Sequence, residues 1–289
     1  MSSVTVNEPV LTITPEHEVA ISRVVAAMQA EPDYPFTLDT LAEIANFSPY
    51  HFARLFRSLI GIPPGEFLTA LRYERAKQLL LTTNLSVTDI CFEVGYDSLG
   101  TFSSRFKRLI GLSPAGFRAL PAVMEAFAVA DLPPIPTVFP DLGIPARIQG
   151  RVISPPGVSG DWHVYVGIFP ASIARGNPVS GVRIGLNEGF ALQHVPRGNF
   201  RLLSAAVPVD APPTAHLLPQ ATMMVASYPD VISIETGHEQ YDIPLMLRPP
   251  SPLEPPVLIA LPALTLPAVF ALPPARNRDL LMLATATQD

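Results

Sequence analysis

The sequence predicts a multidomain chain, an all-α N-terminal domain followed by an all-β sandwich of about seven strands. Two observations predict this order. Apolar residues recur at helical spacing up to about residue 118, and short alternating or β-branched runs follow further along the chain. Proline usage changes at the same place, because eight of the 34 prolines precede residue 119 and 26 follow it. The chain therefore combines two parts of different composition.

Composition excludes several classes of protein. Hydrophobic residues make up 48% of the 289 residues and charged residues 15%, which excludes a disordered chain. The net charge of −6 argues against a generic polyanion binder over the whole chain. Residues 36–118 nevertheless carry nine basic and seven acidic side chains, a local net charge of +2. The acidic average therefore conceals a mildly basic N-terminal part.

Cysteine usage and the N-terminal residues indicate a cellular compartment. The single cysteine, Cys91, excludes a disulfide framework and suits a reducing environment. The first residues, MSSVTVNEPV, lack the pattern of a signal peptide. The uncharged stretch 255–275 contains six prolines, too many for a good membrane-spanning helix, and we expect extended structure packed on the sandwich or a partner. We therefore expect a cytoplasmic protein without membrane contact.

A proline-rich segment divides the chain. The stretch DLPPIPTVFPDLGIP carries a proline every few residues, and such a segment favours an extended spacer over a helix. The domain boundaries that we predict are a flexible N-terminus (1–15), a helical domain (16–120), a linker (121–146), a β-sandwich (147–248) and a proline-rich apolar extension (249–289). The predicted strands lie at 147–153, 163–169, 190–195, 200–207, 222–228 and 241–247.

The helical part contains an internal repeat. FARLFRSLIGIPPGEF (52–67) aligns without gaps to FSSRFKRLIGLSPAGF (102–117) at an offset of 50 residues. The upstream segments 38–48 and 88–98 also correspond, so each half predicts a helix, a short turn, a second helix and a glycine stop. Residues 64–83 contain no internal breaker and predict one long connecting helix.

Two short helices joined by a tight turn are typical of a helix-turn-helix, whose second helix can enter the DNA major groove. In the helix expected at 49–60, Phe52, Leu55, Phe56 and Leu59 form an apolar stripe. The opposite face carries Tyr50, Ala53, Arg54 and Arg57, and the helix contains no acidic residue. A merely solvated face usually includes Glu or Asp, so this pattern favours DNA reading over an ordinary packed hairpin.

Residues 16–120 resemble the DNA-binding module of the AraC/XylS family, which has seven helices and two helix-turn-helix units bridged by a long helix. The resemblance rests on LAEIANFSPYHFARLFRSLIGIPP (41–64), FLTALRYERAKQLLLTT (67–83), VGYDS (94–98) and FSSRFKRLIGLSPAGFR (102–118). It implies a transcriptional regulator that reads two successive major grooves of double-stranded DNA. Carried over position by position, it places the base-reading residues at Tyr50, Ala53, Arg54, Leu99, Gly100, Ser103 and Ser104.

The second unit departs from the family pattern. Ser104 stands where an arginine is usual, and the nearest guanidinium has moved to Arg105, about 100° around the helix. The internal repeat gives the same contrast, because Arg54 corresponds to Ser104 while Arg57 corresponds to Lys107. The second helix is therefore expected to bind DNA phosphates, while the first is expected to determine which base sequence is bound. The expected phosphate contacts are His51, Arg57, Arg105, Lys107 and Arg108.

No catalytic or cofactor-binding constellation is recognisable in the sequence. The histidines of the second half show no ligand spacing, and no GxSxG, GxGxxG or Walker loop occurs. Cys91 is expected to be a buried core thiol. We therefore expect no enzyme, no cofactor and no metal.

The β half resembles carboxypeptidase-regulatory-like, transthyretin-type sandwiches. The resemblance rests on IQGRV (148–152), VYVGIF (164–169), the hairpin GFALQHVPRGNFRLL (189–203) and ISIETGHEQYDIPLML (232–247). It implies a binding or structural module. Two functions stay open: a regulator whose sandwich senses a small effector, forms a homodimer or binds a partner such as RNA polymerase, and an architectural DNA-binding protein whose sandwich has an independent role.

Overall fold

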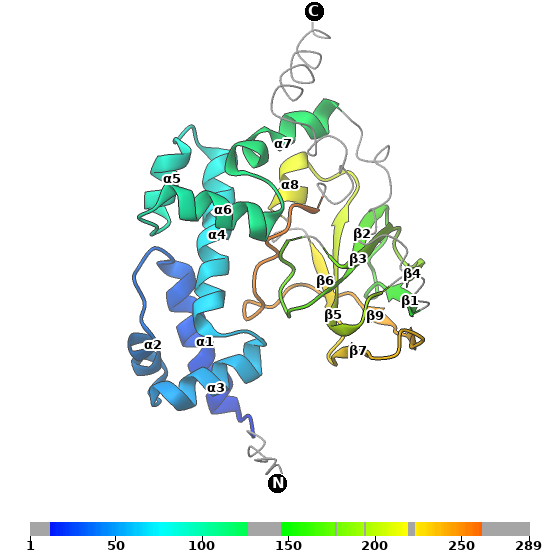
Figure 1. Cartoon of the computed structure of the whole chain (residues 1–289), viewed down its shortest axis with the longest axis horizontal. Helices are drawn as coiled ribbons and strands as arrows, with labels where there is room; N and C mark the ends of the chain where they lie inside the picture. Colours follow the sequence, from blue (N-terminus) through cyan, green and yellow to red (C-terminus); the bar gives the residue numbers. More distant parts are fainter. Residues whose placement is uncertain (1–11, 127–145, 177, 194, 219–222, 262–289) are drawn as a thin grey trace, which may run out of the picture.

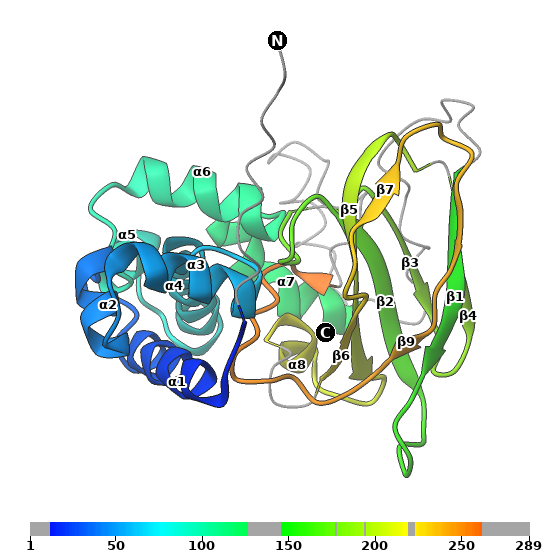
Figure 2. The ribbon, with the colours of Figure 1, turned by 90° about the horizontal axis from the view of Figure 1, so that it is seen from below.

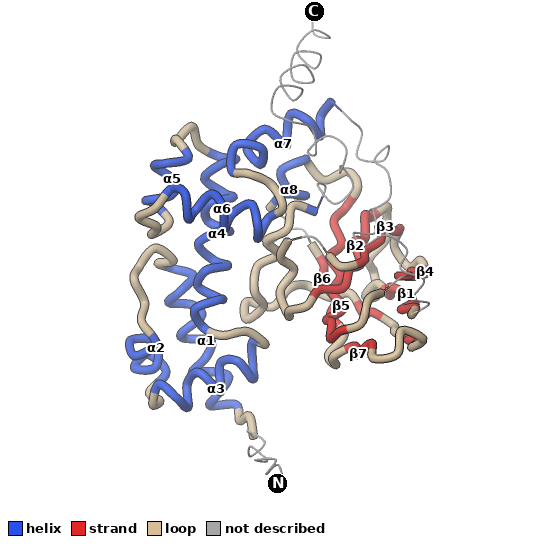
Figure 3. Tube along the Cα trace, viewed as in Figure 1, coloured by secondary structure: helices blue, strands red, loops and turns tan. Residues whose placement is uncertain are grey.

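A computed structural model describes residues 12–126, 146–176, 178–193, 195–218 and 223–261. Helices occupy one side of the molecule and strands the other, which confirms the predicted α-then-β order (Figures 1 and 3). The helices are α1 (Pro15–Ala30), α2 (Leu38–Ala45), α3 (Pro49–Ile60), α4 (Pro64–Thr82), α5 (Val87–Glu93), α6 (Leu99–Ile110) and α7 (Pro114–Ala126). The short helix α8 (Pro213–Leu217) lies within the β half.

The long helix α4 is the axis of the helical part. Helices α1, α2 and α3 gather at one end of α4 and α5 and α6 at the other, as Figure 1 shows. Phe67 and Tyr73 of α4 are fully buried, and their rings contact those of Phe56 on α3 and Phe102 on α6. Both predicted helix pairs are therefore packed on one continuous helix.

The 50-residue repeat is confirmed in the backbone. Helices α3 and α6 are offset by exactly that interval, as are the starts of α4 and α7. Each of the two repeated helices stops at a glycine in the left-handed region, Gly61 with φ of 86° and Gly111 with φ of 94°. Glycine adopts this conformation without the steric cost that a Cβ atom adds.

The predicted linker begins too early. Helix α7 continues through Pro121 to Ala126, although a proline inside a helix removes one backbone hydrogen bond. Leu120 and Met124 are buried in the helical core, and their packing offsets that loss. The segment 127–145, which contains the rest of the predicted linker, lies outside the described residues, as does the N-terminal segment 1–11.

The β half is a sandwich of two sheets. One sheet has the order β4-β1-β8, with β9 also pairing β1, and the other has the order β3-β2-β5-β6, with β7 pairing β5. The sheet containing β2 lies nearer the helices, as Figure 2 shows. The strands are β1 (Arg147–Ile153), β2 (Trp162–Phe169), β3 (Ser180–Ile184), β4 (Gly189–Gln193), β5 (Gly198–Pro208), β6 (Met224–Ser227), β7 (Ile232–Ile234), β8 (Gln240–Asp242) and β9 (Leu245–Met246).

The strand predictions differ from the structure in two respects. Strands β3 and β7 are not among the predicted strands, because they span only five and three residues. The expected strand 241–247 is divided into β8 and β9 by Ile243 and Pro244. Proline cannot donate a hydrogen bond to a neighbouring strand, so it interrupts the pairing with β1.

The C-terminal extension is not a separate appendage in its described part. Residues 248–261, which we call the strap, run from the sandwich to the helices, as the orange segment in Figure 1 shows. Leu258 and Ala260 belong to the helical core, while Ile259 and Leu261 pack on the outer face of the β2-containing sheet. The strap therefore contributes apolar side chains both to the helical core and to the outer face of the sheet. None of the described helices is long and apolar enough to cross a membrane.

A hydrogen bond from a buried lysine ties the strap to α4. Lys77 is completely buried, and its Nζ atom donates to Glu74 Oε2 and to the Val257 carbonyl, each at 3.0 Å. A charge buried this deeply is tolerated only when its hydrogen bonds are satisfied. The strap carbonyl therefore completes an interaction that begins inside the helical part.

Two buried histidines join β2 to α8. The rings of His163 and His216 lie 6.0 Å apart, and His163 Nε2 and His216 Nδ1 have no hydrogen-bond partner among the described residues. Burial lowers the pKa of both groups, and for His163, which also faces Arg183, the pKa falls to about 4. Both imidazoles are therefore neutral in the folded chain at pH 7.

This pair predicts a loss of stability in mild acid. In the unfolded chain a histidine takes up a proton below about pH 6.5, whereas in the folded chain His163 stays neutral down to about pH 4. The free energy of unfolding should therefore fall by about 1–3 kcal/mol as the pH drops from 6.5 to 4. Urea unfolding of the chain and of a His163→Leu variant across this range measures the effect. An equal pH dependence in both proteins would contradict it.

Candidate nucleic-acid interface

The helices α3 and α6 begin by the same local chemistry. Ser48 precedes α3 and accepts a hydrogen bond from the backbone N–H of His51, and Ser98 precedes α6 and accepts one from Thr101, both at 3.4 Å. A serine at this position satisfies one of the free N–H groups of the first turn. The serine caps and the glycine stops fix both ends of each helix.

Each of these helices has a buried and an outward face. Phe52, Leu55 and Phe56 of α3 and Phe102 and Phe106 of α6 are completely buried. Tyr50, on the opposite face of α3, is 68% exposed, a large exposed aromatic surface for a fold that buries most of its rings. The burial pattern therefore turns the predicted reading positions of α3 away from the core.

The outward face of α3 is a strip formed by Tyr50, Ala53, Arg54 and Arg57. The guanidinium carbon of Arg54 lies 5.7 Å from the centre of the Tyr50 ring, a geometry that attracts a cation to the ring face. Arg57 is exposed, and Ala53 adds little bulk between the larger side chains. This strip presents two cations and an aromatic ring on one side of a capped helix.

The outward face of α6 has small side chains and one cation. Leu99, Gly100, Ser104 and Lys107 are exposed, and Ser103 is half-buried. A Cβ atom built on Gly100 would meet nothing within 4 Å, so this part of the helix faces open space. The Ser104 hydroxyl donates to the Thr101 carbonyl at 3.1 Å. The outward face of α6 therefore carries Ser104 where α3 carries Arg54, which is the contrast that the repeat predicts.

His51 lies beside the strip rather than within it. Its half-buried ring contacts Phe47 at 4.9 Å and His17 at 5.8 Å between ring centres. These edge-to-face contacts hold the start of α1 against the turn between α2 and α3. A phosphate contact by His51 stays a prediction.

Arg105 does not lie with Lys107. It is half-buried, its Nε atom is enclosed, and it lines a cavity together with Glu66, Arg175 and Leu258. The shift of one position that separates it from Ser104 rotates the guanidinium toward α4 and the C-terminal half. A phosphate contact by Arg105 stays a prediction, and so does one by Arg108, which lines the same cavity.

The C-terminal half contacts the ends of α3 and α6, a contact that no sequence pattern predicts. Ser172, in the loop between β2 and β3, lies 3.3 Å from where a Cβ of Gly61 would stand. Gly176, in the same loop, donates to the Leu109 carbonyl at the end of α6 at 2.6 Å. Arg108 is exposed beside this contact. No sequence signal marks these loop residues as partners of the helices.

The described residues bear on metal binding and on the reactivity of Cys91. No group of three or more His, Cys, Asp or Glu side chains in these parts of the chain is placed to hold a metal. Cys91 is buried as predicted, and burial raises the pKa of its thiol. A buried, protonated thiol is a poor nucleophile and a poor metal ligand.

Comparison with known proteins matches the helical part. A family described as a helix-turn-helix domain matches residues 41–119. The "HTH-type transcriptional activator AarP" of Providencia stuartii is 34% identical over 98 residues, which cover 34% of this chain and 73% of AarP. The "Bifunctional transcriptional activator/DNA repair enzyme AdaA" of Bacillus subtilis is 36% identical over 91 residues, which cover 32% of this chain and 43% of AdaA.

One solved structure among the matches contains DNA. The DNA-binding domain of the global transcriptional factor AdpA in complex with a target DNA is 35% identical, with a TM-score of 0.33, over 35% of this chain and 90% of that chain. A domain of a Chromobacterium violaceum regulator described as AraC-type is 29% identical, with a TM-score of 0.34, over 35% of this chain and 91% of its own.

The extent of the sequence match decides the family. At 34% identity the chain spans nearly three quarters of AarP, and the matched residues include both helix-turn-helix units. The resemblance of the β half to carboxypeptidase-regulatory-like sandwiches is not confirmed by these matches, which involve the helical part. On the evidence of its helical part, the chain belongs to the family of HTH-type transcriptional regulators that includes AarP.

Proposed function

We propose that the chain is a sequence-specific regulator that places α3 and α6 in two successive major grooves on one face of double-stranded DNA. One observation carries this proposal: α3 and α6 are capped at both ends, contain no Asp or Glu, and pack at opposite ends of α4. Successive major grooves on one face of DNA are about 34 Å apart. A single continuous helix between the two units supports a fixed spacing between them.

The two helices have unequal roles in this proposal. Tyr50, Ala53 and Arg54 read base edges from α3, because arginine is the side chain best suited to pair bidentately with guanine. Arg57, Lys107 and Arg108 contact phosphates. Leu99, Gly100, Ser103 and Ser104 face base edges from α6, and the small side chains at positions 100, 103 and 104 let this helix approach the groove closely. His51 and Arg105 are the remaining candidates for phosphate contacts. The exposure of Lys107 and the open space at Gly100 support this division.

We further propose that the β half senses a small molecule. The support is its contact with the last turns of α3 and α6 through Ser172 and Gly176, since a change in the sandwich there can shift both helices. A homodimer and a contact with RNA polymerase remain predictions. An architectural DNA-binding role is the alternative, with the sandwich acting independently of the helices.

Selection from a random pool of duplex DNA, followed by footprinting, tests the function. A regulator that docks two helices in successive grooves should protect one discrete site of about two helical turns. An architectural protein should instead select no consensus and protect no discrete site. The second outcome would contradict the proposal.

The proposed roles predict different effects for two substitutions. Arg54→Ala should cost about 1–3 kcal/mol of binding free energy and relax the preference at one or two base pairs, because one bidentate contact is lost. Lys107→Ala should weaken binding to every sequence and reduce the slope of log affinity against log salt by about one. Ser104→Arg should tighten binding by supplying the cation that the second helix lacks.

Affinity for single-base variants of the selected site, measured at two salt concentrations, separates these effects. Arg151→Ala is the matched control, since Arg151 is an exposed arginine on β1 in the sheet farther from the helices. The roles are reversed if Arg54→Ala lowers every affinity equally while Lys107→Ala changes the base preference.

A further inference from the structure

A large cavity lies between the two halves of the chain. Its volume is about 760 Å³, within the range of pockets that hold small organic molecules. One wall is the end of α3 with Leu71 of α4, and the facing wall is the outer face of the β2-containing sheet. Strap residues 250–257 close a third side. The cavity therefore exists only where the helices, the sandwich and the strap meet.

Apolar side chains dominate the lining. The pairing of Tyr165 with Ala205 and of Gly167 with Leu203 places these four residues together on the outer face of the sheet. Leu59 of α3 contributes from the opposite wall. The side chains of Phe169 and Pro178 pack against Gly167 and also line the cavity. This surface suits the body of an apolar molecule.

A polar group in this lining lacks a partner. Tyr165 is 3% exposed, and its hydroxyl has no hydrogen-bond partner among the described residues. Leaving such a group unpaired in an apolar site costs free energy that a bound acceptor would recover. Burial also raises the pKa of Tyr165, which keeps the hydroxyl protonated and able to donate. The Tyr165 hydroxyl is therefore an unpaired hydrogen-bond donor on a residue that lines the cavity.

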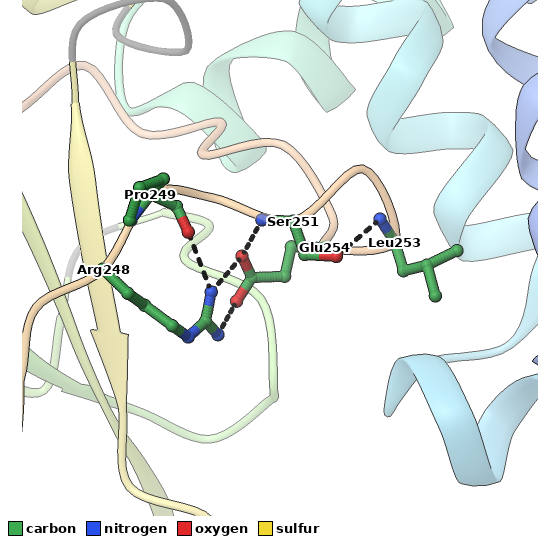
Figure 4. A network of polar contacts seen from close by, with 5 residues as sticks. All are labelled: Arg248, Pro249, Ser251, Leu253 and Glu254. Carbon is green, nitrogen blue, oxygen red and sulfur yellow. Dashed lines mark hydrogen bonds and ion pairs between the residues drawn. The ribbon is translucent and has the colours of Figure 1, made fainter.

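The charged groups at the cavity are already engaged. Arg248 donates to both carboxylate oxygens of Glu254, and the same carboxylate accepts from the Ser251 N–H at 2.7 Å, as Figure 4 shows. Arg201 donates to the Pro229 carbonyl at 2.7 Å. The Arg248–Glu254 pair holds the strap turn in place, and its charges compensate one another. The compensated Arg248–Glu254 pair offers no free charge to an anion, and Arg201 is held by the Pro229 carbonyl.

We propose that this cavity binds a small, neutral, mostly apolar molecule with one hydrogen-bond acceptor directed at the Tyr165 hydroxyl. The ligand would contact Ser58, Leu59 and Gly61 in the last turn and cap of α3, the helix proposed to read bases. This inference rests on the proposed function only in treating the ligand as an effector. Occupancy of the cavity can be measured without DNA.

Nile red, a neutral apolar dye, is the first probe for the full-length chain. It should bind with a saturable, blue-shifted emission at one dye per chain. Leu203→Trp, which fills the floor, should weaken binding at least tenfold. Ser227→Trp offers a second obstruction from an exposed position on β6, where the larger side chain costs the fold little. Far-UV circular dichroism confirms folding of both variants.

The hydroxyl is tested with a matched pair of competitors. 2-Acetylnaphthalene carries a carbonyl that 2-ethylnaphthalene lacks, and the two molecules have nearly the same size. Tyr165→Phe should weaken the ketone about five- to tenfold and leave the hydrocarbon unchanged, because one hydrogen bond is lost. Tyr241→Phe is the control, since Tyr241 donates to Ser233 in the sandwich and does not line the cavity.

Each alternative result overturns the inference. Absent dye binding, or equal binding in a folded Ser227→Trp variant, would show that the cavity is not the site. An equal effect of Tyr165→Phe on both competitors would remove the hydroxyl from recognition. Stronger competition by 2-naphthoate than by the ketone would replace the neutral class with an anionic one. A chain that binds the dye but selects no DNA site would instead contradict the proposed function alone.

Discussion

The buried ammonium group of Lys77 is the interaction on which the arrangement of this protein depends. It lies inside the helical part, yet one of its two hydrogen-bond acceptors is the carbonyl of Val257, 180 residues further along the chain. Burying an unpaired charge costs free energy, so the Val257 carbonyl of the strap stabilises Lys77 in its buried position on α4. The strap in turn inserts Leu258 and Ala260 into the helical core, so helices and sandwich are held together by charge and by apolar contact.

This constraint bears directly on DNA recognition. Helix α4 positions α3 and α6, and the loop between β2 and β3 contacts the ends of both through Ser172 and Gly176. The sandwich therefore borders the proposed reading surface without covering Tyr50, which stays exposed. A ligand between the halves would contact the same helix end, so the two proposed functions meet at the last turn of α3.

Sequence patterns predicted the local structure well and the long-range contacts poorly. The repeat located α3, α6 and their glycine stops, because helix caps and apolar spacing are local properties. Pro121 suggested a boundary six residues too early, since the packing of Leu120 and Met124 outweighs the lost hydrogen bond. Arg105 lines a cavity together with Glu66, Arg175 and Leu258, which are distant from it in sequence. The cavity between the halves is also lined by residues that are distant in sequence, so no apolar periodicity in the sequence predicts it.

Urea unfolding followed by two probes tests most directly whether the halves form one structural unit. Trp162, the single tryptophan, reports on the sandwich through its fluorescence, and circular dichroism at 222 nm reports mainly on the helices. Shared core and the bond from Lys77 to Val257 predict coincident transitions in the intact chain. Two separated transitions, with the helical one unchanged when Lys77 is replaced by Met, would contradict this account.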